Sequence, residues 1–266
     1  INYAQLYAQA KHLILNGERY WLNDEDETLI AGWTSFSNVS SPIAADVAGS
    51  KPNSTISYSG WNGDNRSDDN LASSSSLVPA SGNSLGLINA TSRTDVNNGK
   101  NIVIQTSTKD YGHIKLKLDY GIERYKWLLP VVYSDDDKGF TELSFAYSTD
   151  GVNYSEPVMK TITLEQQERT DGSYEWDLSA ASSQNVDNSE HLYIKITFNG
   201  AKRSSGVMPE QYSLLDNICI SGTKTIDDLT ITGDPIVCTN QGISLMATPP
   251  YVNTEVEPSV TTPINY

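Results

Sequence analysis

Four residues in one polar stretch carry the side chains that sugar binding needs. Tyr58, Trp61, Asp64 and Arg66 lie in or beside SGWNGDNRSDDN at 59–70. Aromatic rings can stack on the apolar faces of sugars, while carboxylates and guanidinium groups bond to sugar hydroxyls. No strand alternation surrounds Trp61, so its ring is either a loop cap or a binding platform. We therefore predict a sugar-binding loop here.

A second candidate cluster lies further along the chain. Tyr111 and Arg124 are near Tyr125 and Trp127, although the alternation around Trp127 also suits a core position. His113 between them adds a titratable group. Tyr111 and Arg124 are therefore further candidates for sugar binding. Jelly-roll polysaccharide lyases use a Tyr/His pair beside Arg or Asn, so His113 with Tyr111, Tyr120 and Arg124 is the candidate set for an enzyme.

The motifs expected of a catalytic site are missing. The sequence has no E-x-D-x-x-E strand signature of a two-carboxylate glycosidase, and no G-x-S-x-G or H-E-x-x-H string. His12, His113 and His191 are the only histidines. A lyase or glycoside hydrolase is therefore the alternative hypothesis and not the leading one.

The charge balance disfavours two classes of partner. Lys and Arg number 18 against 33 Asp and Glu, a formal charge of −15. Such a chain repels phosphate backbones and anionic lipid headgroups, so we expect no nucleic-acid partner. No apolar run approaches the ~20 residues of a spanning helix, so we expect no membrane insertion.

The two cysteines, Cys219 and Cys238, are too few for a disulfide framework or a four-ligand zinc site. Cys219 lies in the middle of an expected strand, where a small buried residue fits. Pairing between the two is left open.

Strand and turn signals dominate from Trp33 to Gly222. In 143–155 apolar and small residues alternate, and Asp150-Gly151 predicts a tight hairpin with Val152 and Tyr154 opening the return strand. An acidic loop is expected at 134–139. Further strands are expected at 55–58, 84–90, 101–105, 113–120, 159–164, 173–178, 192–198 and 212–221. Short strands at this spacing without helical crossovers predict a jelly-roll β-sandwich over 33–222.

The two ends of the chain have a different texture. Residues 2–16 show helical spacing of apolar positions, and Asn23 can cap a second short helix that ends at Gly32. We expect 1–32 to be a helical segment, and 223–266 to be a small β extension or the start of another module. Ile1 is not an initiator Met, which suggests a piece of a longer protein.

One half of the sandwich sequence follows a recurrent pattern. It comprises YSTDGVNYSEPV, EWDLS, HLYIKITF and YSLLDNICISGT, and the matching positions are Ser148, Asp150, Gly151, Asn153, Tyr154, Trp176, Leu178, Leu215, Asp216, Asn217, Ile218, Ile220 and Gly222. This pattern resembles the second half of jelly-roll, carbohydrate-binding-module-like accessory domains in secreted multidomain proteins of glycan-degrading bacteria. The segment 233–248 is similar to the opening strands of Ig-like modules in the same proteins. The resemblance implies a secreted or cell-surface location and neighbouring domains in a larger chain.

Asp216 is the candidate metal ligand. We place it on the inward face of a terminal strand with Leu214, Ile218 and Ile220, and a buried carboxylate must be paired or bind a metal. Carbohydrate-binding sandwiches often hold a structural Ca²⁺ where the first and last strands meet, and backbone carbonyls near 27–33 could complete its cage. The competing interpretation is a strand carboxylate that accepts backbone N–H bonds.

The leading hypothesis is a non-catalytic carbohydrate-binding β-sandwich whose partner is a polysaccharide or oligosaccharide. The enzyme described above is one alternative. A structural spacer or adhesion module that binds no small ligand is the other.

Overall fold

The computed structural model describes residues 27–128, 131–181, 185–204, 211–225, 230–232 and 246–248, without the side chains of 125–132, 181, 230–232 and 246–248. The chain divides into two compact units. One is Glu27–Thr223, and the other is residues 1–26 with 224–266. In the second unit β14 (Thr230–Thr232) pairs antiparallel with β15 (Met246–Thr248). The helix predicted at 2–16 lies outside the described residues, and so does Cys238.

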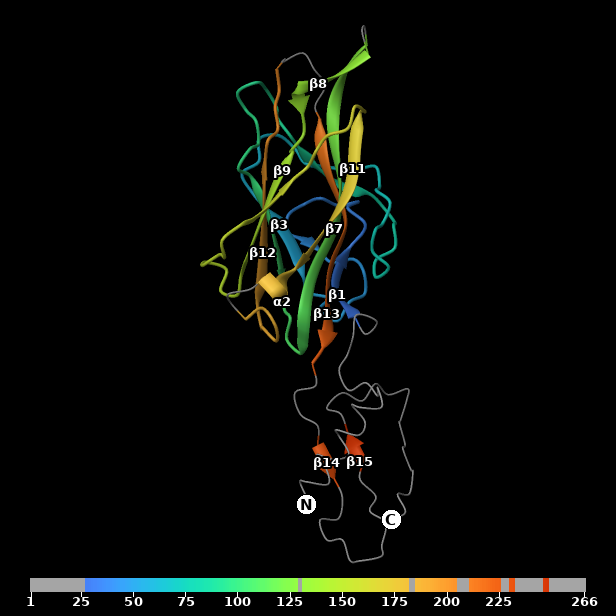
Figure 1. Cartoon of the computed structure of the whole chain (residues 1–266), viewed down its shortest axis with the longest axis vertical. Coiled ribbons are helices and arrows are strands. Elements are labelled where there is room, and N and C mark those ends of the chain that lie inside the picture. Colours follow the sequence, from blue (N-terminus) through green and yellow to red (C-terminus); the bar gives the residue numbers. More distant parts are fainter. Residues whose placement is uncertain are drawn as a thin grey trace, which may run out of the picture. The chain divides into compact units, whose positions relative to one another are not determined.

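Two sheets make up the unit Glu27–Thr223 (Figure 1). The first has the order β11-β7-β13-β5-β4, with β1 also on β13 and β8 also on β7. Its strands are β1 (Glu27–Trp33), β4 (Arg66–Asp68), β5 (Ser84–Ile88), β7 (Tyr111–Leu128), β8 (Val131–Lys138), β11 (Arg169–Asp177) and β13 (Tyr212–Lys224). The second has the order β10-β9-β12-β6-β3-β2. Its strands are β2 (Ile43–Ala44), β3 (Thr55–Tyr58), β6 (Asn101–Thr106), β9 (Glu142–Ser148), β10 (Val158–Thr161) and β12 (Leu192–Asn199).

The hydrophobic core lies between the sheets and confirms the predicted jelly-roll β-sandwich. On β12 the side chains alternate strictly between buried and half-buried, as its sequence predicts. Ile114, Leu116 and Leu118 of β7 are buried in the same cluster, while Lys115 and Lys117 point away from it. One helical turn, α2 (Leu178–Ala181), follows β11.

The prediction of a helix that ends at Gly32 is wrong from Glu27 onward. Glu27–Trp33 forms β1, which pairs antiparallel with β13. Ile30, Ala31 and Trp33 are buried in the core as a result. Tertiary pairing therefore overrides the local helical signal from Glu27 onward. The sandwich begins at Glu27 and not at Trp33.

The side-chain alternation of β13 shifts by one residue at Asn217. Asn217 has a left-handed backbone with φ 47°, and one such irregular residue moves all later side chains to the other face. Leu215 and Ile218 both belong to the main core, whereas Leu214 belongs to a second cluster with Tyr212. The expectation that Leu214 and Asp216 share a face with Ile218 is therefore wrong.

The turn after β9 is longer than a tight hairpin. Asp150 accepts hydrogen bonds from the backbone N–H groups of Val152 and Asn153, both at 2.8 Å. These bonds hold the pKa of Asp150 well below its usual range. The return strand β10 begins at Val158, not at Val152.

The acidic segment expected as a loop at 134–139 lies largely in strand β8. Asp137 is buried there and accepts hydrogen bonds from the backbone N–H and the hydroxyl of Ser204. A carboxylate with its own donors can occupy a strand despite its low strand propensity.

Candidate functional site

The predicted sugar-binding loop forms a recess in the structure. Its volume is about 370 Å³, and its lining comes from the end of β3, the loop between β3 and β4, and the segment after β1. We call it the aromatic recess, and its lining residues are Val39, Ser40, Tyr58, Ser59, Gly60, Trp61, Gly63, Asp64 and Asn65. Tyr58, Trp61 and Asp64 are thus brought together as predicted.

Glycine at position 63 is required by the shape of this loop. Gly63 has φ 84°, which side chains rarely adopt. A Cβ there would lie 2.6 Å from a methyl carbon of Thr91 and 2.8 Å from a methyl carbon of Ile88. The loop therefore packs directly against the segment that follows β5.

The buried side chain of Asn97 holds the loop in place, and sequence reasoning missed it. Its Oδ1 accepts the backbone N–H of Asn62 at 2.9 Å, and its Nδ2 donates to the carbonyls of Asn62 and Ile88, each at 2.9 Å. Asn97 is 0% exposed. A single amide thus binds both polar backbone groups of Asn62, which lies between Trp61 and Gly63.

Trp61 is a wall of the recess anchored in the core, not a free platform. Its indole N–H donates to the carbonyl of Asn101 at 3.4 Å. Its ring meets Phe140 and Phe198 in edge-on contacts, with centroids 5.9 and 5.8 Å apart. The ring is half-buried, so only part of it can contact a ligand.

Tyr58 and Asp64 supply the polar character of the recess. The Tyr58 hydroxyl donates to the carbonyl of Val39. Burial raises the pKa of Tyr58, the side chain of Asn65 opposes this rise, and the carboxylate of Asp64 adds to it. The phenol is therefore neutral at physiological pH, beside an exposed carboxylate. Two aromatic rings with carboxylate and amide groups match the chemistry of sugar recognition.

Arg66 does not line the aromatic recess. It lies on β4 with its guanidinium 3.7 Å from the ring centroid of Tyr212 and its Nη2 2.6 Å from Asp68. Glu123 lies nearby and accepts the backbone N–H of Tyr212 at 2.7 Å. Burial raises the pKa of Glu123 above its usual value, and the positive charge of Arg66 offsets part of this rise. Arg66 thus belongs to a separate polar cluster on the first sheet.

The structure does not bring Tyr111 and Arg124 together. Both lie on β7, thirteen residue steps apart, which at about 3.3 Å per step is roughly 40 Å. Tyr111 is buried in the core. The buried guanidinium of Arg124 donates to the carbonyls of Ser134 and Glu165 and pairs with Asp135. His113, near Tyr111, is exposed.

Asp216 lies under the loop that follows β4, where backbone N–H groups bind it. Its carboxylate oxygens accept the N–H of Leu71 and of Asn217, each at 2.8 Å, and the side chain is 0% exposed. Burial raises the pKa of Asp216 to about 6, with nearby Asp119 adding to the rise and the two N–H bonds opposing it. This is the arrangement of a hydrogen-bonded strand carboxylate.

The polar neighbours of Asp216 include a second carboxylate, Asp119, which also has its own hydrogen-bond donors. Asp119 accepts the N–H of Ser74 at 3.0 Å and the amide of Asn217 at 3.0 Å. Within the described part of the chain, no group of three or more His, Cys, Asp or Glu side chains is placed to hold a metal ion. Calcium at Asp216 therefore stays a prediction.

Cys219, expected to be buried, is a buried free thiol. Burial raises its pKa to about 12. Among the residues that the structure describes, no helix is long and apolar enough to cross a membrane.

Comparisons with known proteins reveal similarity in structure only. No family model and no curated protein matches the sequence. The K2 cleaved adhesin domain of Lys-gingipain has 13% identity and a TM-score of 0.31, with 63% of this chain and 80% of that chain covered. A family 11 carbohydrate-binding module from Clostridium thermocellum, in complex with a β-1,3-1,4-mixed-linked tetrasaccharide, has 14% identity and a TM-score of 0.33, with 74% and 96% covered. TmCBM61 in complex with β-1,4-galactotriose has 9% identity and a TM-score of 0.27, with 59% and 86% covered. Similarities of this size carry no functional argument.

Proposed function

We propose that this chain is a non-catalytic carbohydrate-binding β-sandwich whose ligand is an oligosaccharide or a segment of polysaccharide. The observation that carries the proposal is the aromatic recess, in which Tyr58 and Trp61 flank the polar groups of Asp64 and Asn65. Partly exposed rings can cover one face of a sugar, while the exposed carboxylate of Asp64 accepts hydrogen bonds from its hydroxyls. The recess is open and small, which suits binding at one or two sugar units.

The first test is affinity electrophoresis of the full chain in gels that contain plant or host polysaccharides. We expect one polysaccharide class to retard the protein, with no unsaturated or reducing ends formed. Appearance of either product would support the lyase or hydrolase alternative. The placement of Tyr111 and Arg124 at distant points of β7 gives that alternative no support.

The site itself is tested with Asp64→Ala. Hydrogen bonds to a charged group contribute about 1.5–3 kcal/mol, so affinity should fall roughly tenfold to a hundredfold. Asp136→Ala is the matched control, because Asp136 is an exposed carboxylate that only approaches Lys202, at 4.0 Å. Equal binding by both variants would refute the assignment. Trp61→Ala is less informative, because it also removes ring contacts in the core.

The proposal extends to a secreted or cell-surface location beside other domains, as the sequence resemblance implies. Fractionation of the source cells with an antibody against the chain tests this part. Recovery in the cytosol would contradict it without affecting the binding proposal. If every polysaccharide fails to bind, a structural spacer or adhesion module becomes the better interpretation.

A further inference from the structure

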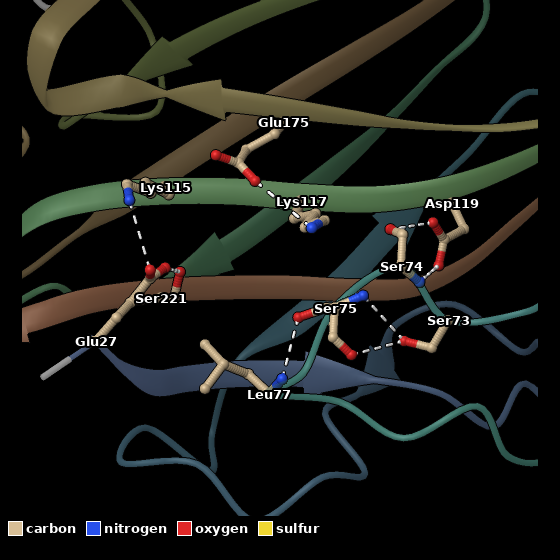
Figure 2. Close-up of polar contacts among 10 residues, drawn as sticks. All are labelled: Glu27, Ser73, Ser74, Ser75, Leu77, Lys115, Lys117, Asp119, Glu175 and Ser221. Atoms are coloured by element: carbon tan, nitrogen blue, oxygen red, sulfur yellow. Dashed lines mark hydrogen bonds and ion pairs between the residues drawn. The ribbon is translucent and has the colours of Figure 1, made fainter. Parts of the chain in front are cut away.

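A second recess, without aromatic side chains, lies on the outer face of the first sheet. Its volume is about 210 Å³. We call it the polar recess, and its lining residues are Glu27, Ser74, Ser75, Ser76, Leu77, Lys115, Lys117, Glu175, Cys219 and Ser221. They come from β1, β7, β11 and β13 and from the serine-rich segment between β4 and β5. Figure 2 shows this segment beside the two lysines of β7.

Two ammonium–carboxylate pairs form the core of the polar recess (Figure 2). Nζ of Lys115 lies 3.5 Å from Oε2 of Glu27, and Nζ of Lys117 lies 3.6 Å from Oε2 of Glu175. Alternate residues of a strand point to the same face, so both lysines project from β7 to the same side. Each pair thus places an ammonium donor next to a carboxylate acceptor on the same face of the recess.

The pairs differ from an ordinary solvated surface in their burial. The side chains of Lys115, Glu27 and Lys117 are only 20%, 23% and 27% exposed. Glu27 also accepts the hydroxyl of Ser221, which fixes its carboxylate. Glu175 is 54% exposed, so it is the group that can most readily turn towards a ligand.

The serine-rich segment that forms one wall of the recess is held in position. The backbone N–H of Ser74 donates to Asp119 at 3.0 Å, and the hydroxyl of Ser73 donates to the carbonyl of Val78 at 2.7 Å. The N–H of Leu77 donates to the hydroxyl of Ser75 at 3.2 Å. The wall is therefore preorganised, and ligand binding would not have to order it.

We propose that the polar recess binds one neutral sugar unit or a similar polyol through hydrogen bonds alone. The lysine and glutamate charges of its lining balance, and the chain carries a formal charge of −15, so a neutral ligand fits better than an anion. Sugar hydroxyls both donate and accept, as do the paired groups here. Without a stacking ring, binding is weak, in the region of 1 mM, and depends on the stereochemistry of the hydroxyls. This site uses different residues from the aromatic recess and is independent of it.

The test is ligand-observed NMR titration of the full chain with neutral hexoses at constant ionic strength. Lys117→Met removes the ammonium but keeps the length of the side chain, and Ser76→Trp fills the recess from an exposed position. We expect the affinity for the hexose to fall at least about tenfold in the first variant and to vanish in the second. Lys109→Met is the matched control, because Lys109 is a half-buried lysine outside the recess whose Nζ lies 3.9 Å from a carboxylate oxygen of Glu190, and this variant should bind as the wild type does.

Three outcomes would overturn the inference. One is wild-type binding by both Lys117→Met and Ser76→Trp, with unchanged melting temperatures. Another is a hexose signal that Asp64→Ala removes and Lys117→Met retains, because this assigns the ligand to the aromatic recess. The third is no response to any neutral hexose at concentrations far above 1 mM while polysaccharide retardation persists, which would leave the proposed function intact.

Discussion

The amide of Asn97 gives the sharpest prediction, because this one side chain binds both polar backbone groups of Asn62 in the loop of the aromatic recess. Asn97→Ala removes three hydrogen bonds, to the N–H and carbonyl of Asn62 and to the carbonyl of Ile88. At about 1 kcal/mol each, the free energy of unfolding should fall by about 3 kcal/mol. For a domain of this size, that corresponds to a melting temperature lower by about 6–12 °C.

Asn97→Asp separates hydrogen-bond geometry from simple loss of packing. An aspartate keeps the oxygen that accepts from Asn62, but its second oxygen faces two carbonyls in a fully buried position. An ionised carboxylate there should destabilise more than alanine does at pH 7.5. At pH 4.5 the protonated acid can donate to one carbonyl, so the difference between the variants should shrink.

Urea unfolding of wild type, Asn97→Ala and Asn97→Asp at both pH values measures these effects, and affinity electrophoresis measures the recess. Both variants should also bind polysaccharide more weakly, because Asn62 lies between Trp61 and Gly63. The reasoning is refuted if Asn97→Asp is at least as stable as Asn97→Ala at pH 7.5. Normal polysaccharide binding by a folded Asn97→Ala would separate the loop from the ligand.

Three further predictions concern Asp216 and Gly63. The raised pKa of Asp216, about 6 against 3.8 unfolded, means that the fold favours the protonated acid. Its contribution is fully present below pH 3.8 and is lost as the pH rises through 6. From pH 4 to 7.5 wild type should therefore lose roughly 2 kcal/mol of stability relative to Asp216→Asn in urea titrations. A pH-independent difference would contradict this. If Asp216 binds the predicted Ca²⁺, calcium should raise the melting temperature by several degrees and EDTA should reverse the rise, because each of its oxygens accepts only one N–H bond and keeps a lone pair for a cation. An unchanged melting temperature would contradict the predicted metal site. Gly63→Ala should lower stability by at least about 1 kcal/mol and weaken polysaccharide binding, whereas Gly99→Ala, at a similar φ of 82° with open space around it, should affect stability alone; equal binding loss in both would contradict the role of the loop.

The sandwich could be predicted where local pattern and burial agree. Strict alternation on β12 identified its inner face correctly, and β3 begins and ends at the predicted residues. β1 was missed because its strand conformation depends on pairing with β13, almost two hundred residues away. The faces of β13 were assigned wrongly because alternation assumes regular backbone, and the left-handed Asn217 interrupts it.

The candidate site could be predicted in part, for a similar reason. Tyr58, Trp61 and Asp64 are close in sequence, so a single loop brings them together. Tyr111 and Arg124 were grouped by chemistry, but a continuous strand keeps them apart. The sequence contains no signal for the role of Asn97. Its side chain binds the backbone of a loop 35 residues away, and the residues next to it in sequence are those of an ordinary turn.

The pairing of β1 with β13 also determines when the sandwich can be completed during synthesis. All strands of the second sheet precede residue 200, so that sheet can form while β13 is still inside the ribosome. The first sheet lacks its central strand until the last part of the unit emerges. During this interval the apolar face of the second sheet has no complete partner, and long-range pairing of this kind is slow. We therefore expect the nascent chain to be most prone to aggregation before β13 joins β1, β5 and β7.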